Sequence, residues 1–271
     1  MLTVMQISSK RNLCIAPRLL WMLGLFALSA CIGYGQSASN QHAKLAYAAD
    51  KNNVPDAIAK VQSGQFSLVH VELIAEAHAV QAIPALKEQF GRNQDTLTRT
   101  KLASALVRLG TDDPAYWDFL IQQATTAVQS PEPRLFDAQG NVVPKKLSPT
   151  FLEWSRTSNV SPDPVYELPL RVRLLGETAD PRAVPLLRQG LYSPNYFIQA
   201  AAARGLADIQ DKDSIPLIIA ACQRGSSEAA AAIALSLVYF DDPHAQNVLE
   251  TYVPGETVKA LRAAKAQGLR P

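Results

Sequence analysis

The sequence has little of the residue types from which catalytic and metal sites are usually built. Its 271 residues include only 3 cysteines, 4 histidines and 7% aromatic residues. It contains no Cys/His cluster with zinc-ligand spacing, no G-x-S-x-G elbow, no phosphate-binding glycine loop and no dinucleotide fingerprint. We therefore expect a non-enzymatic protein with no catalytic residues, no metal and no cofactor.

The histidines closest to a metal-binding pattern are His70 and His78, which lie two helical turns apart on one face. Ile74 stands between them, where a zinc-binding helix would carry a ligand or a base. We interpret both histidines as packing or surface residues.

Two aspartate pairs, Asp112-Asp113 and Asp241-Asp242, have the composition of an acid–base or calcium site. Both pairs fall in turns before expected helices, where helix capping accounts for them. Cys222 shares the apolar face of an expected helix, so we interpret it as a small buried hydrophobe rather than a nucleophile.

The N-terminus is typical of a secretory signal peptide at residues 1–30. Lys10, Arg11 and Arg18 precede an apolar run at 19–30 that is too short to cross a bilayer as a stable helix. Removal of the signal leaves 23 basic and 24 acidic residues, so the mature chain is almost neutral. Such a chain lacks the clustered Lys and Arg on which nucleic-acid binding depends, and we expect no nucleic-acid partner.

The end of the signal, "LSAC" at 28–31, resembles the bacterial lipobox, in which the cysteine is lipidated. The resemblance implies a lipid anchor at Cys31, and Ile32 after it favours the outer membrane. Ordinary cleavage nearby, with Cys31 incidental, is the alternative. We expect an exported protein of the bacterial periplasm or outer membrane, anchored if Cys31 is modified.

A repeated pattern fills the rest of the chain. An anchor residue is followed at +4, +7, +8 and +11 by apolar residues that line one face of a helix, with some positions missing. The anchors are Asp50, Ala79, Asp113, Asp180, Asp211 and Asp241. The last three are 31 and 30 residues apart, which is the length of one helical pair with its turns.

Proline follows four of these anchors by five residues. Amides in the first helical turn have no partner within the helix, so proline there marks a helix start. A second helical pattern rich in Ala and Leu follows each anchored helix, as in "YFIQAAAARGLADI" at 196–209.

The segment "DPRAVPLLRQGLYSPNYFIQAAAARGLADIQD" (180–211) resembles the short, Ala-rich HEAT repeat. The resemblance implies an all-α fold, an α-solenoid of about six helical pairs over residues 50–268, with 31–49 as a linker or short helix. It implies protein binding on a concave face formed by the second helices.

The step from Asp113 to Asp180 is 67 residues, which predicts a proline-rich insertion at 130–162 in the third repeat. A tolerated surface loop is one reading. The other is a partner-binding segment, because it carries Phe136, Phe151 and Trp154 among prolines and polar residues.

We therefore predict an exported protein-interaction scaffold. An enzyme or enzyme subunit resembling the phycobilin-lyase-like HEAT proteins is the alternative, although the export signal argues against a cytosolic pigment lyase. A purely structural spacer is a third reading.

Overall fold

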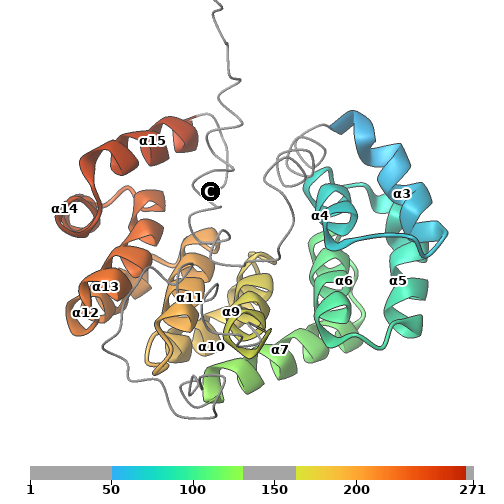
Figure 1. Ribbon diagram of the computed structural model, residues 1–271, viewed down its shortest axis with the longest axis horizontal. Coiled ribbons are helices and arrows are strands. Elements are labelled where there is room, and N and C mark those ends of the chain that lie inside the picture. The colour runs from blue at the N-terminus through green and yellow to red at the C-terminus, as the bar shows by residue number, and fades with distance from the viewer. Residues whose placement is uncertain (1–50, 131–162, 267–271) are drawn as a thin grey trace, which may run out of the picture.

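The computed structural model describes residues 51–130 and 163–266, and in these ranges every regular element is a helix. The helices are arranged in antiparallel pairs that follow one another along a curved array (Figure 1). This arrangement confirms the prediction of an all-α solenoid.

Six pairs make up the array, and each has its first helix on the outer side of the curve and its second helix on the inner side (Figure 1). The pairs are α3 (Val54–Gln62) with α4 (Leu68–Glu76), α5 (Ile83–Arg92) with α6 (Thr96–Arg108), α7 (Pro114–Gln129) with α9 (Asp163–Gly176), α10 (Val184–Gly190) with α11 (Tyr196–Asp208), α12 (Ile215–Arg224) with α13 (Ser227–Ala234) and its extension η5 (Leu235–Tyr239), and α14 (Pro243–Tyr252) with α15 (Gly255–Ala266).

The four repeated prolines stand at helix starts, as the sequence predicts. Each is the second residue of its α-helix, where the missing amide hydrogen costs no hydrogen bond within the helix. They are Pro55, Pro84, Pro185 and Pro216.

The aspartate anchors do not all act as helix caps. The Asp113 carboxylate accepts a hydrogen bond from the Ala115 amide at 3.0 Å, as expected of a cap. At the last pair the cap is Asp242, whose carboxylate accepts from an amide of α14, while Asp241 forms an ion pair with Lys265 at 2.7 Å. Asp211 caps no amide with its side chain and binds Arg188 instead. Capping thus accounts for Asp113 and for Asp242 of the second aspartate pair, whereas the carboxylates of Asp211 and Asp241 pair with cations.

Four of the inner helices end in the same turn. Two or three residues after each helix ends, one residue has a left-handed backbone with φ between 51° and 82°, and three of these four residues are not glycine. They are His78, Gly110, Ala179 and Gln210. The next anchor follows this residue directly at Ala79, Asp180 and Asp211, and after two further residues at Asp113.

The apolar faces form one continuous core. Leu187 and Ile218 are fully buried, and burial raises the pKa of the Cys222 thiol to about 12, so this thiol stays protonated and unreactive at neutral pH. The predicted register of α7 holds at Leu120 and Ala124, which are fully buried, but not in the first turn of the helix. Tyr116 is buried where the pattern assigned Trp117, and the Trp117 ring lies partly exposed under the Arg182 guanidinium at 4.2 Å.

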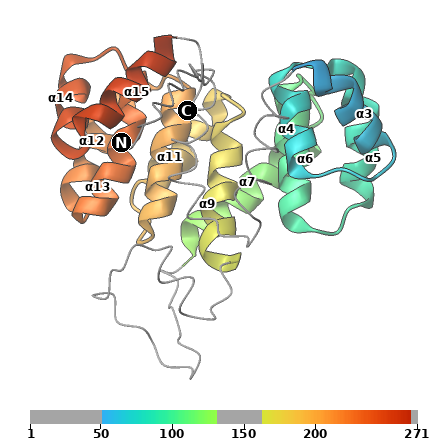
Figure 2. The same cartoon turned by 45° about the horizontal axis from the view of Figure 1, so that its top comes forward.

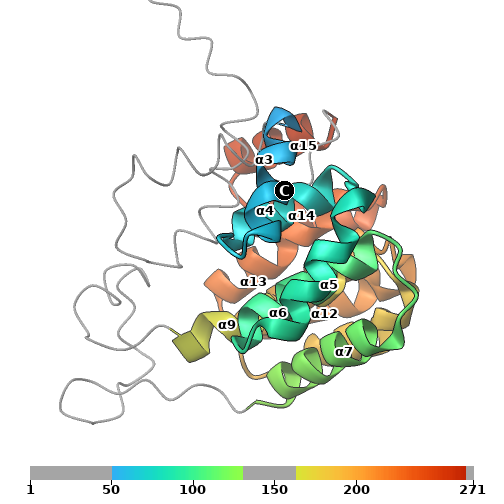
Figure 3. The same cartoon turned by 90° about the vertical axis from the view of Figure 1, so that its right-hand side faces the viewer.

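Neighbouring inner helices pack side by side, as α9 and α11 do (Figure 2). A Cβ atom added at Gly176 of α9 would lie 2.4 Å from the Cα atom of Gly205 in α11, so only glycine fits there. Seen from the end that carries α5 and α6, α7 continues the outer row and packs against α6 (Figure 3).

This contact predicts that Gly176→Ala lowers the free energy of unfolding by about 1–3 kcal/mol, because the new methyl group meets backbone that cannot move aside. Gly91→Ala in α5 is the matched control, since nothing lies within 4 Å of its Cβ position and alanine favours the helix by about 0.5–1 kcal/mol. Urea unfolding of both variants measures the difference. Equal effects of the two substitutions would show that α9 and α11 do not touch here.

Candidate functional site

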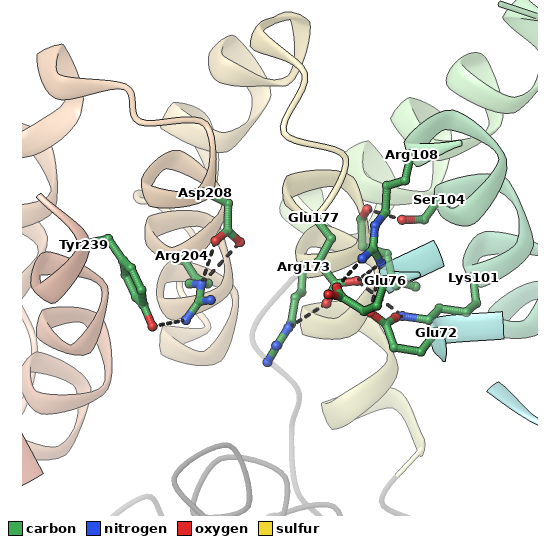
Figure 4. Close-up of polar contacts among 11 residues, drawn as sticks. Glu72, Glu76, Lys101, Ser104, Arg108, Arg173, Glu177, Arg204, Asp208 and Tyr239 are labelled. Atoms are coloured by element: carbon green, nitrogen blue, oxygen red, sulfur yellow. Dashed lines mark hydrogen bonds and ion pairs between the residues drawn. The ribbon is translucent and has the colours of Figure 1, made fainter. Parts of the chain in front are cut away.

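The inner face carries a cluster of charged side chains from three successive second helices (Figure 4). We define the inner-face cluster as the six residues that join α4, α6 and the end of α9. They are Glu72, Glu76, Lys101, Arg108, Arg173 and Glu177.

Lys101 stands at the centre of this cluster. Its ammonium group contacts the Glu72 carboxylate and lies 3.3 Å from the Glu177 carboxylate. Arg108 reaches the same two carboxylates, at 3.0 Å and 3.7 Å, and also contacts Glu76. Glu72 thus binds two cations and Glu177 three, because Glu177 also pairs with Arg173 at 3.0 Å. These ion pairs link helices that are far apart in the sequence.

Burial sets the electrostatics of the cluster. The Lys101 and Arg108 side chains are 11% and 9% exposed, so each needs a counter-charge. Burial alone would raise the pKa of Glu177, but the positive charges of Lys101, Arg173 and Arg108 outweigh it, and the pKa lies below its ordinary value. The pKa of Glu72 is lowered in the same way by Lys101 and Arg108. Three anions therefore face three cations at neutral pH.

A second polar group follows on the next inner helices. The Arg204 guanidinium donates through Nε to the Asp208 carboxylate at 3.1 Å and through Nη1 to the Tyr239 hydroxyl at 3.0 Å (Figure 4). Burial raises the pKa of the Asp208 carboxyl, and the opposing effect of Arg204 does not cancel it. Arg204 thus links α11 to η5 and continues the polar row along the inner face.

His70 and His78, the two histidines considered as metal ligands, lie at the two ends of α4. His70 accepts a hydrogen bond through Nδ1 from the Ser67 amide at 2.8 Å and so takes part in the capping of α4. His78 lies two residues after the end of α4 and has a left-handed backbone conformation. Across residues 51–130 and 163–266, no three His, Cys, Asp or Glu side chains are placed to hold a metal ion.

A hollow of about 600 Å³ lies between α12 and α14. Its floor includes Ile215, Ile219 and Phe240, and its rim includes Lys212 and His244. The rim also carries Asp241 and Asp242. The Asp241 carboxylate pairs with Lys265, and the Asp242 carboxylate caps α14.

The residues that the sequence singled out as sites are not among those that the structure describes. Cys31, the predicted lipidation site, and the predicted partner-binding residues Phe136, Phe151 and Trp154 all lie outside the described ranges. The inner-face cluster was missed by sequence reasoning. Its one visible signal in the sequence is the i,i+4 pair Arg173–Glu177, because the other pairings of the cluster join distant segments. The i,i+4 pair Arg204–Asp208 is the corresponding signal of the second polar group.

Removal of the central cation is expected to be costly. Lys101→Met leaves buried carboxylates with too little positive charge, and we expect the free energy of unfolding to fall by about 3 kcal/mol. The matched control is Lys259→Met, which breaks the exposed pair with Glu256 and should change stability by less than about 1 kcal/mol.

The same experiment has a pH readout. Because the folded pKa values of Glu72 and Glu177 lie below their ordinary value, their stabilisation is complete above pH 4.5 and is lost as the pH falls through the folded values. Lys101→Met should flatten this acid dependence. A stability loss no larger than that of the control, with an unchanged pH profile, would mean that the cluster does not hold the helices together.

Comparison with known proteins agrees with the repeat pattern. Residues 184–270 match the family model described as HEAT repeats. No curated protein and no solved structure matches the chain.

Of the helices in the described ranges, none has the length and apolar character needed to span a membrane. HEAT repeats form helical scaffolds for protein interaction, and the paired helices before residue 184 continue the same arrangement. Residues 184–270 of this chain are therefore HEAT repeats.

Proposed function

We propose that this protein is a non-enzymatic scaffold that holds a protein partner on the inner face of its solenoid. The observation that carries the proposal is the row of second helices, whose charged side chains are fixed by one another rather than left to move in solvent. A surface whose side chains are already ordered loses less conformational entropy on binding.

Export and anchoring belong to the same proposal. The N-terminal sequence supports a secretory signal at residues 1–30 and a lipid on Cys31, which would place the solenoid in the periplasm or at the outer membrane of a bacterial cell. Phe136, Phe151 and Trp154 are proposed to add contacts to the partner from the 130–162 segment.

Site-specific photo-cross-linking tests where the partner binds. A photoreactive phenylalanine at Ala201 of α11 lies on the same helical face as Arg204 and Asp208, since residues spaced by three and seven share a face. The control position is the exposed Gln189 of α10, in the outer row. We expect a discrete cross-linked protein from envelope extract with the probe at Ala201 and none with the probe at Gln189. Cross-links only from the outer position, or from neither, would contradict the proposal.

The anchor has its own test. Cys31→Ala should abolish metabolic labelling with palmitate and move the protein from the membrane to the soluble envelope fraction, because the thiol is the acceptor of the lipid. Cys222→Ala is the matched control and should leave labelling unchanged, since that thiol is buried. Labelling that persists without Cys31 would remove the anchor from the proposal.

A further inference from the structure

We propose that Arg173 and Arg204 together accept a carboxylate side chain from an acidic segment of the protein partner. This inference rests on the proposed function, and it names the chemistry by which the inner face would recognise a peptide. It concerns the guanidinium groups on neighbouring helices α9 and α11.

The two guanidinium groups have hydrogen-bond donors left over. Arg173 uses Nε for the Glu177 carboxylate at 3.0 Å, and its two terminal nitrogens have no acceptor in the described part of the chain. Arg204 uses Nε and Nη1, and its Nη2 likewise has no acceptor among the described residues. A guanidinium group cannot lose its charge, so these donors favour an incoming acceptor.

The fold brings these donors together. The glycine contact between Gly176 and Gly205 lets α9 and α11 approach more closely than side chains would allow. The positive charge of Arg173 consequently reaches both partners of Arg204, acting on Asp208 and on the Tyr239 hydroxyl. Figure 4 shows the Arg173 side chain extending between the inner-face cluster and the Arg204 group.

Both side chains are held in place and still accessible. Arg173 is 29% exposed and Arg204 is 16% exposed, and each is fixed by a carboxylate four residues further along its own helix. An incoming carboxylate would therefore meet pre-oriented donors, and charge-assisted hydrogen bonds of this kind are among the strongest in proteins.

The surrounding charges favour a single carboxylate over a polyanion. Glu177 and Asp208 flank the two arginines, so a phosphate chain or an acidic polysaccharide would bring further negative charges against fixed anions. Beside Arg204, Ala201 lies three residues earlier on the same face of α11 and is only partly buried, so it offers apolar contact to the residues next to the carboxylate. A peptide with Glu or Asp among apolar residues fits both features.

Selection from a random dodecapeptide phage library on the intact protein tests this inference. We expect the selected peptides to be enriched in Asp or Glu next to apolar residues, and replacement of the acid by its amide should weaken binding by roughly tenfold to a hundredfold. Two variants should weaken binding to a similar degree. One is Arg173→Gln, and the other is the double variant Arg204→Gln with Asp208→Asn, which leaves the net charge unchanged. Arg92→Gln, in an exposed pair on outer helix α5, should not change it.

Thermal unfolding of each variant shows whether it is folded, and Arg173→Lys provides a second readout if Arg173→Gln is unstable. Lysine keeps the charge but lacks the planar fork, so it should recover only part of the affinity. Selection of neutral or basic peptides, or binding that ignores both arginines, would overturn this inference and leave the scaffold proposal intact. Binding of heparin with the same arginine dependence, in place of peptides, would also overturn it. Failure to select any peptide would count against the scaffold proposal itself.

Discussion

The inner face of this solenoid depends on how closely its second helices approach one another. Small residues set that distance, and at the contact between Gly176 and Gly205 the two backbones meet directly. Close approach removes water from between the helices, and charged residues on them must then find partners among themselves. The packing of small residues in the core is thus the physical cause of the polar row on the surface.

That polar row has consequences for binding. Lys101 joins carboxylates of α4 and of the segment after α9, and Arg204 joins α11 to η5, so the polar contacts run across most of the array. Because the anions are already neutralised, the remaining donor capacity of the inner face belongs to the arginines. The face is therefore ordered, nearly neutral and rich in directed donors, which suits recognition of a specific segment better than non-specific electrostatic attraction.

Local features of this fold could be predicted from the sequence, and long-range features could not. Prolines such as Pro185 report helix starts because their effect is confined to one turn. The pairing of Lys101 with Glu177 spans 76 residues and depends on how successive repeats stack, which no local pattern encodes. Two adjacent acids, as at Asp241 and Asp242, satisfy the same pattern, and only the turn geometry decides which one caps the helix. In α7, Tyr116 packs edge-to-face on Phe90 of the preceding repeat and is buried in place of Trp117, and periodicity alone does not encode this contact.

The helices before and after residues 131–162 form one continuous array held together at the inner face. Native-state hydrogen exchange tests it most directly, by comparing the slowest amides of α6 with those of α11 at low denaturant concentrations. Both helices should open with the same free energy, because Lys101 and Ser104 of α6 contact α9 or its end, and α9 packs on α11. Exchange of α6 through a separate opening of clearly lower free energy than that of α11 would contradict it, since the two halves would then be independent units.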